Sequence, residues 1–161
     1  MSEQYDSDLL LEDSKGENAG SSKDLHLVFR IEDEDYAINV ADVHDILPLT
    51  SLLLRRVPKT PSFMKGIINN RGDIIPVICV RAKFMKPEKE YDFETCIVRV
   101  AANEHSIGLI VDKVLGVETI SPEKIKPPPN AKLSFANQFI KNIGVVDGQV
   151  RMILSREKLI F

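Results

Sequence analysis

The stretch GIINNRGDIIPVICVRAKF, residues 66–84, decides the fold. Its two halves are rich in Ile and Val, which fit a pleated, half-buried surface, and Arg71-Gly72-Asp73 separates them. A glycine at a two-residue reversal supplies the positive φ that a tight hairpin requires. The stretch therefore predicts two apolar strands folded back on each other. Arg71 is either a solvated tip or a positioned charge that needs a carboxylate partner.

The composition limits the class of protein. The chain has 161 residues, 43% of them hydrophobic and 6% aromatic, with no Trp. A core built from Ile, Val and Leu favours strands. Residues 1–24 contain seven acidic and two basic side chains, so the formal charge of this segment is -5. The formal net charge of the whole chain is -3, so residues 25–161 carry +2. A nearly neutral body gives no electrostatic basis for binding nucleic acid or inserting into an anionic membrane.

The amino-terminal segment 1–24 is predicted to be a disordered acidic tail, because acids, Ser and Gly dominate its composition. It lacks the basic and apolar regions of a secretory signal. The longest apolar run, residues 74–80, is far shorter than the ~20 residues of a transmembrane helix. We therefore expect a cytoplasmic protein, in which Cys79 and Cys96 are free, buried thiols.

The first half of the body predicts short strands joined by turns. Residues 25–31 alternate in hydropathy, which predicts a half-buried strand, and residues 36–40 restart the alternation after an acidic turn. Val43, Ile46 and Leu47 follow at helical spacing, which predicts a short helical turn. Prolines on both sides confine residues 52–57 to a short strand.

The second half repeats this pattern about 70 residues later, which predicts a duplicated β unit. Residues 96–100 and 107–111 alternate as strands, Val114 follows them, and Asp147-Gly148 marks a hairpin like that at Gly72. We expect a mainly β domain over residues 25–161. Its first barrel should lie at about 36–90 and its second at about 91–150, and terminal segments could be exchanged between them. Barrels this small need a shared apolar seam.

No catalytic, cofactor or metal site is expected. His26, His44 and His105 have no metal-ligand spacing. Neither cysteine lies near a basic cluster that would activate it, and the glycines do not form a phosphate-binding loop. The chain is therefore predicted to be non-enzymatic.

Four segments, in order, resemble the CheW family, the adaptor of bacterial chemotaxis arrays. Residues 66–84 resemble the family core KGxxNxRGxxxPVxDLRxxF, and residues 43–46 its V-x-E-I segment. Residues 107–114 resemble its xGxxVDxV strand, and residues 125–129 its IxPxP loop. The resemblance implies two SH3-like, five-stranded β-barrels with an apolar groove between them and short helices at the connections.

The resemblance also implies two partners. A chemoreceptor cytoplasmic tip would bind the groove, and the regulatory domain of the CheA histidine kinase would bind one barrel, in arrays at the inner membrane. The groove residues would be Val43, Asp45, Ile46, Gly66, Arg71, Gly72, Gly108, Val114 and Val117. The kinase-binding residues would be Leu52, Leu54 and Arg56. In this reading Asp45 is the carboxylate that holds Arg71.

Other functions stay open at this point. The kinase regulatory domain and CheV, which adds a phosphoreceiver, share this type of domain, but from a chain of 161 residues we expect neither a kinase nor a receiver domain. A small barrel that binds nucleic acid belongs to another class. Such a barrel requires a basic groove with exposed aromatic side chains, which the composition does not favour.

Overall fold

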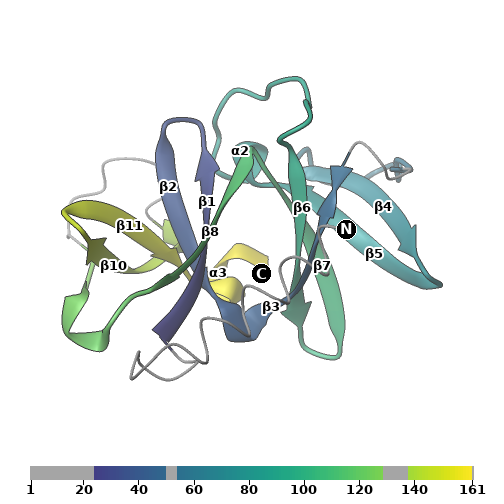
Figure 1. The fold of residues 1–161 in the computed structure, drawn as a ribbon. Helices are drawn as coiled ribbons and strands as arrows, with labels where there is room; N and C mark the ends of the chain where they lie inside the picture. The colour runs from purple at the N-terminus through teal and green to yellow at the C-terminus, as the bar shows by residue number, and fades with distance from the viewer. Residues whose placement is uncertain (1–23, 50–53, 129–137, 161) are drawn as a thin grey trace.

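The computed structural model describes residues 24–49, 54–128 and 138–160. Within them the chain is mainly β, with eleven strands in two sheets and short helices at the connections (Figure 1). Sheet A has the order β8-β1-β2-β11-β10-β9, and sheet B has the order β3-β6-β7-β5-β4. The strands are β1 (Leu25–Ile31), β2 (Glu34–Asn39), β3 (Val43–Pro48), β4 (Met64–Asn70), β5 (Asp73–Cys79), β6 (Cys96–Ala102), β7 (His105–Val111), β8 (Lys113–Thr119), β9 (Ile125–Lys126), β10 (Ile140–Val146) and β11 (Gln149–Leu154). The helices are η2 (Val40–Asp42), α2 (Val80–Lys83), η4 (Pro122–Lys124) and α3 (Arg156–Ile160).

Each half of the chain begins with a hairpin in one sheet and then crosses to the other sheet, a crossing that we call the strand exchange. After the β1–β2 hairpin of sheet A, β3 crosses to pair with β6 in sheet B, and after the β6–β7 hairpin of sheet B, β8 crosses to pair with β1 in sheet A. In each half a hairpin in one sheet is followed by a strand in the other sheet, which agrees with the predicted duplication. The predicted boundary near residue 90, however, falls between β5 and β6, which belong to the same sheet. All five strands of sheet B lie within residues 43–111, and a parallel pairing of β7 with β5 joins the strands on either side of this boundary.

The central hairpin forms as predicted. β4 and β5 pair antiparallel, with Asn70 opposite Asp73, so Arg71 and Gly72 make a two-residue loop. Both have positive φ, 56° and 93°, as the hairpin turn that matches the strand twist requires. The side-chain oxygen of Asn69 accepts a hydrogen bond from the Gly72 N–H at 2.9 Å.

The segment after η2 is a strand and not the predicted helical turn. In β3 the register against β6 shifts between Val43 and Asp45, and such a bulge inserts one extra residue into the alternation. Because of this extra residue, Val43, Ile46 and Leu47 have the apolar spacing of a helix although they lie in a strand. Ile46 and Leu47 are both buried because they belong to different core clusters, on opposite faces of the sheet.

The prediction of a half-buried first strand was also wrong. β1 has a neighbour on each edge, and both of its faces are covered. Phe29 points into the main core while Val28 lies in a smaller cluster within sheet A, and each is fully buried. Strands that are covered on both sides show weaker sequence alternation than half-buried ones.

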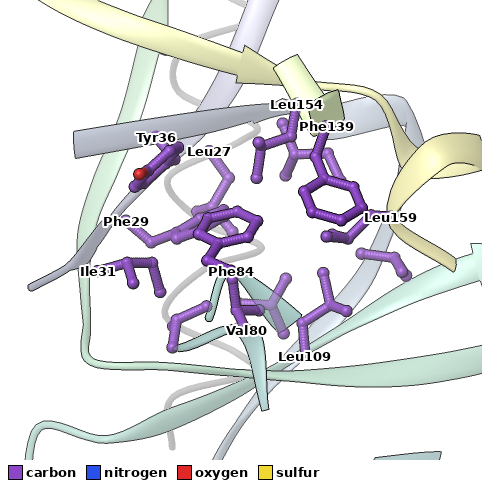
Figure 2. Close-up of a cluster of buried hydrophobic side chains, with 14 of the residues drawn as sticks. Leu27, Phe29, Ile31, Tyr36, Val80, Phe84, Leu109, Phe139, Leu154 and Leu159 are labelled. Atoms are coloured by element: carbon purple, nitrogen blue, oxygen red, sulfur yellow. The ribbon is translucent and has the colours of Figure 1, made fainter. Parts of the chain in front are cut away.

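The largest hydrophobic cluster joins the two sheets, so the predicted apolar seam is confirmed. It contains residues of sheet A such as Phe29 and Tyr36, residues of sheet B such as Leu109, and Phe84 and Leu159 from the helical segments (Figure 2). Each sheet also has a smaller cluster of its own. Burying an aliphatic or aromatic side chain contributes ~1.5–3 kcal/mol, so this shared cluster binds the two halves into one unit.

Several further predictions can be compared with the structure. In the segment 52–57 the described part forms one isolated bridge, in which Arg55 and Ile67 exchange backbone hydrogen bonds of 2.9 and 2.7 Å. Both cysteines are free; Cys79 is buried as predicted, but Cys96 is only partly buried. The predicted tail lies outside the described residues, apart from Asp24. No helix among the described residues is long and apolar enough to cross a membrane.

Candidate functional site

The exchanged strands β3 and β8 carry the apolar part of the candidate site. Each is a terminal strand in the order of its sheet. Val43 on β3 and Val114 and Val117 on β8 are partly buried and pack against the shared core cluster. Ile46 is 5% exposed and belongs to the core itself. Three of the four predicted apolar groove residues therefore lie at the border of the core, and the fourth lies beneath them.

The carboxylate of Asp45 is bound by Arg99, which the sequence analysis did not propose. The two residues face each other across β3 and β6, and the guanidinium makes two hydrogen bonds, Nε to Oδ1 at 3.0 Å and Nη2 to Oδ2 at 2.8 Å. Both side chains are 16% exposed. Arg99 Nη1 also lies 3.7 Å from Asp73 Oδ2 in the central hairpin. The Asp45–Arg99 pair therefore joins β3 to β6 and lies near the hairpin tip.

The hairpin tip, Arg71 and Gly72, is exposed. A contact between Arg71 and Asp45 stays a prediction, and the ion pair of Arg99 with Asp73 shows that the tip lies near the Asp45 pair. The signal for Arg99 was present in the sequence, since it lies in the middle of a predicted strand. Because residues 43–47 were predicted to form a helical turn, the cross-strand pairing of Arg99 with Asp45 could not be predicted.

A polar cleft of about 400 Å³ lies next to the hairpin tip. Its lining includes Gly72 and Asp73 from the tip, Arg99, and two imidazoles, those of His44 and His105. These histidines are 61 positions apart in the sequence, and the pairing of β3, β6 and β7 brings them to one cleft. The described residues contain no group of three or more His, Cys, Asp or Glu side chains that could hold a metal ion.

Gly66 and Gly108, both predicted to face a receptor, are buried. A Cβ at Gly66 would lie 2.0 Å from the carbonyl oxygen of Arg55, and the φ of Gly66 is 143°. A Cβ at Gly108 would lie 2.6 Å from Cγ2 of Ile97, inside sheet B. The structure thus gives both glycines a packing role, and their role in receptor binding stays a prediction.

Two of the predicted kinase-binding residues, Leu54 and Arg56, flank Arg55, which is bridged to Ile67 on β4, the terminal strand of sheet B. Leu54 is partly buried against the cluster of that sheet, and Arg56 is exposed, whereas Leu52 lies outside the described residues. The neighbouring Arg55 lines a cleft of about 480 Å³ together with Ile67, Asn69 and Ile74. Ile74 is 58% exposed, which is unusual for a large aliphatic side chain in a strand.

A second polar group, centred on Arg81 and Asp112, joins the sheets. Arg81 of α2 holds the Asp112 carboxylate with hydrogen bonds of 2.8 to 3.0 Å. The same carboxylate accepts the Glu32 N–H, in the β1–β2 turn, at 2.8 Å. Burial acts to raise the pKa of Asp112, but the hydrogen bonds from Arg81 and Glu32 outweigh it and lower the pKa. The sequence analysis quoted both residues within family motifs without giving them a role.

The cysteine chemistry agrees with a structural role. Burial raises the pKa of the Cys79 thiol, which disfavours the nucleophilic thiolate.

Comparison with known proteins decides the family. Residues 25–160 match the family model described as CheW-like domain. The chain belongs to the CheW-like family. It is 29% identical over 145 residues to the chemotaxis protein CheW of Klebsiella aerogenes, covering 90% of this chain and 84% of the relative. It is 31% identical over 158 residues to CheW of Helicobacter pylori, covering 94% and 93%.

A solved structure supports the same assignment. The scaffolding protein TtCheW from Thermoanaerobacter tengcongensis superimposes with a TM-score of 0.79 at 31% identity, covering 85% of this chain and 92% of that one. These matches confirm the predicted family and the mainly β, two-barrel fold class. They also confirm the predicted class of function, a non-enzymatic adaptor of chemotaxis signalling.

Proposed function

We propose that the CheW-like chain couples a chemoreceptor cytoplasmic tip to the CheA histidine kinase by binding each through a separate face. The observation that carries this proposal is the strand exchange, which places β3 and β8 at the border of the shared core. Binding both partners raises the effective concentration of kinase at the receptor. No chemical step is needed for this coupling.

The receptor face is the pair of strands β3 and β8 with the hairpin tip. Val43, Val114 and Val117 offer partly buried apolar surface there. An amphipathic helical hairpin can lay its apolar side on such a surface. Asp45 and Arg71, predicted from the family resemblance, would add charged contacts at the border. The Arg99 pair holds the Asp45 carboxylate in a fixed orientation for this role.

The kinase face is the β4 edge of sheet B, where Leu54 and Arg56 flank the bridge between Arg55 and Ile67. Leu54 leaves part of its apolar side chain accessible, and the exposed guanidinium of Arg56 follows two positions later. Arg is enriched at protein interfaces. Because this face lies along β4 and the apolar part of the receptor face lies on β3 and β8, we expect both partners to be bound at the same time.

Co-sedimentation of the full chain with a receptor cytoplasmic fragment, and separately with the CheA regulatory domain, tests the proposal. Arg71→Ala and Val117→Asp should reduce receptor binding and spare kinase binding, and Arg56→Glu should do the reverse. Lys124→Ala, an exposed position in η4, serves as the matched control. Loss of neither interaction in any of these variants would contradict the assignment.

We also propose a cytoplasmic location in receptor arrays at the inner membrane. A fluorescent fusion of the chain should gather at the sites of receptor clusters. The Val117→Asp fusion should spread through the cytoplasm, and an unchanged distribution of that variant would argue against array recruitment through this face.

A further inference from the structure

A cleft of about 480 Å³ opens at one end of sheet A. Because β1 pairs antiparallel with β2, β2 parallel with β11 and β11 antiparallel with β10, the start of β1, the ends of β2 and β11 and the start of β10 meet at this end. These segments supply a large part of the lining: His26, Asn39, Lys141, Asn142, Ile153 and Leu154. The mouths of β-barrels are preferred sites for small ligands, and the cleft has the volume of such a site, ~300–1,000 Å³.

The side chains on one face of sheet A form three layers along the strands. The middle layer is apolar and contains Val28, Ala37 and Ile153, which are all buried in the small cluster of this sheet. Side chains two positions apart along a strand point to the same face, so a polar layer follows on each side. One polar layer contains Arg30, Asp35 and Arg151, and the other contains His26, Asn39 and Ser155 and lies at the cleft. The floor of the cleft is therefore apolar and its wall is polar.

The two polar layers differ in how their groups are paired. In the first layer the Arg151 guanidinium, 7% exposed, makes hydrogen bonds of 3.0 Å to the carboxylates of Asp35 and Glu118. In the layer at the cleft, His26 is 4% exposed and its Nδ1 lies 2.9 Å from the carbonyl oxygen of Asp24. Within the described part of the chain no group donates a hydrogen bond to the other ring nitrogen, Nε2.

The chemistry of His26 makes this Nε2 a hydrogen-bond acceptor. A carbonyl oxygen can only accept, so Nδ1 carries the ring proton. Burial lowers the pKa of His26 and the charge of Lys141 acts in the same direction, which together outweigh the opposite effect of Asp24. The imidazole is thus neutral at pH 7. Because a buried acceptor is disfavoured unless it receives a hydrogen bond, a molecule in the cleft that carries a donor would be stabilised there.

The charges around the cleft are of both signs. Arg156 and Glu157 line it and form a salt bridge with each other at 2.8 Å. The remaining charged groups of the lining are the carboxylates of Asp24 and Asp42 and the ammonium of Lys141, which is exposed. A cation alone would leave Lys141 without a counter-charge, and an anion alone would face two carboxylates. The lining is therefore complementary to a molecule that carries both a positive and a negative group.

We propose that this cleft binds a small α-amino acid with an apolar side chain. Its ammonium group donates a hydrogen bond to His26 Nε2 and lies beside the carboxylates of Asp24 and Asp42. Its carboxylate pairs with Lys141, and its side chain covers the apolar floor at Ile153. Hydrogen bonds to charged groups are stronger than those between neutral groups, so both charges of the ligand contribute to its selection. This inference goes beyond the receptor and kinase faces and does not depend on them.

NMR titration of the full, isotope-labelled chain with leucine tests the inference. Isoamylamine and isocaproate keep the carbon skeleton of leucine and lack its carboxylate and its ammonium group, respectively. Leucine should shift the amide signals of the lining in a saturable way, together with the nitrogen signal of His26 Nε2. Each of the two comparison ligands should bind about tenfold more weakly or worse, because each loses one charged hydrogen-bonding group.

Two variants locate the carboxylate of the ligand. Lys141→Gln should weaken the binding of leucine about tenfold. Lys126→Gln removes the same charge from β9 at an exposed position outside the lining, and it should leave the affinity within about twofold, because isolated surface charges contribute little. Both lysines are exposed, so we expect both variants to fold, and circular dichroism checks this.

Each other outcome overturns the inference. If isoamylamine binds as tightly as leucine and Lys141→Gln has no effect, the cleft is a cation site. Equal binding of leucine and isocaproate would identify an anion site. If leucine produces no saturable shift at the lining, solvent alone supplies the donor to His26 Nε2. None of these measurements involves a receptor or a kinase, so a negative result leaves the proposed function untouched.

Discussion

At the scale of single residues, Asp45 shows that a predicted charge can have a partner that the sequence did not suggest. Its carboxylate is bound by Arg99 on the neighbouring strand, with both side chains 16% exposed, and its contact with Arg71 stays a prediction. A bidentate pair of this kind is charge-assisted and geometrically specific. Since the pair is largely shielded from water, breaking it leaves one charge without its partner in a poorly solvated place.

Asp45→Ala should therefore lower the free energy of unfolding by ~1–3 kcal/mol. Urea denaturation measures this change. Arg99→Ala should cost a similar amount, and the double variant should cost less than the sum of the two, because the residues contact each other. Asp33→Ala, at an exposed position, is the control and should change stability by less than ~0.5 kcal/mol. Additivity of the two single changes would argue against coupling.

Gly66 and Gly72 provide a second comparison between single residues. Both have positive φ, but a Cβ meets the Arg55 carbonyl at 2.0 Å in the first case and nothing within 4 Å in the second. Gly66→Ala should destabilise the chain by roughly 3 kcal/mol or more, because the backbone must move. Gly72→Ala should cost only ~1 kcal/mol. Thermal unfolding of both variants gives the comparison, and equal losses would contradict the packing role of Gly66.

At the scale of elements, the group of Arg81, Asp112 and Glu32 holds α2, the start of β8 and the β1–β2 turn together. The folded state lowers the pKa of Asp112. A carboxyl group with a lowered pKa stabilises the fold above its unfolded pKa, and this contribution is lost as the pH falls through the folded value. The stabilisation is thus complete near neutral pH and disappears in acid.

Asp112→Asn should be less stable than the parent chain by ~1–3 kcal/mol at pH 7. The difference should shrink as the pH falls below about 4, the ordinary range of an Asp carboxyl, because the parent chain then loses the same interaction. Urea denaturation at pH 7, 5 and 3 measures both curves. If the difference in stability does not depend on pH, the charge of the Asp112 carboxylate does not contribute to stability.

The elements also show why some predictions held. The central hairpin was predicted because Gly72 follows Arg71 between two apolar runs, and this local signal fixes the turn. The β3 strand was mistaken for a helical turn because its bulge between Val43 and Asp45 is set by pairing with β6, about 54 positions away. Local periodicity cannot reveal an irregularity that a distant strand imposes.

At the scale of the whole molecule, the sequence predicted two barrels with a common seam and a possible exchange of terminal segments, but not that β3 and β8 are the strands that cross. The repeat of strand, turn and strand in each half is a local pattern, so it could be found. Which sheet the third strand joins depends on contacts between halves, as in the pairing of Val43 with Val100 and of Leu27 with Val117. For the site, the motifs supplied Asp45 and Arg71, whereas the role of Arg99 became visible only once the strands were placed.

The exchange predicts that the two sheets unfold as one unit. Each sheet contains strands from both halves of the chain, and the largest core cluster has members in both sheets. Leu109, fully buried in sheet B within this cluster, tests the coupling. Leu109→Ala should cost ~2–5 kcal/mol and lower the protection of amides in both sheets together, as seen by native-state hydrogen exchange.

A truncation outside the shared cluster separates this coupling from a general loss of stability. Leu115, on β8 and 37% exposed, lies where removal of the side chain leaves no closed cavity, so Leu115→Ala should cost less than ~1 kcal/mol. Independent barrels would respond differently: Leu109→Ala would lower protection in sheet B alone, and urea unfolding would show two transitions. A single transition with coincident fluorescence and circular dichroism curves is the result that strand exchange requires, because neither sheet can keep all its strands after the other has unfolded.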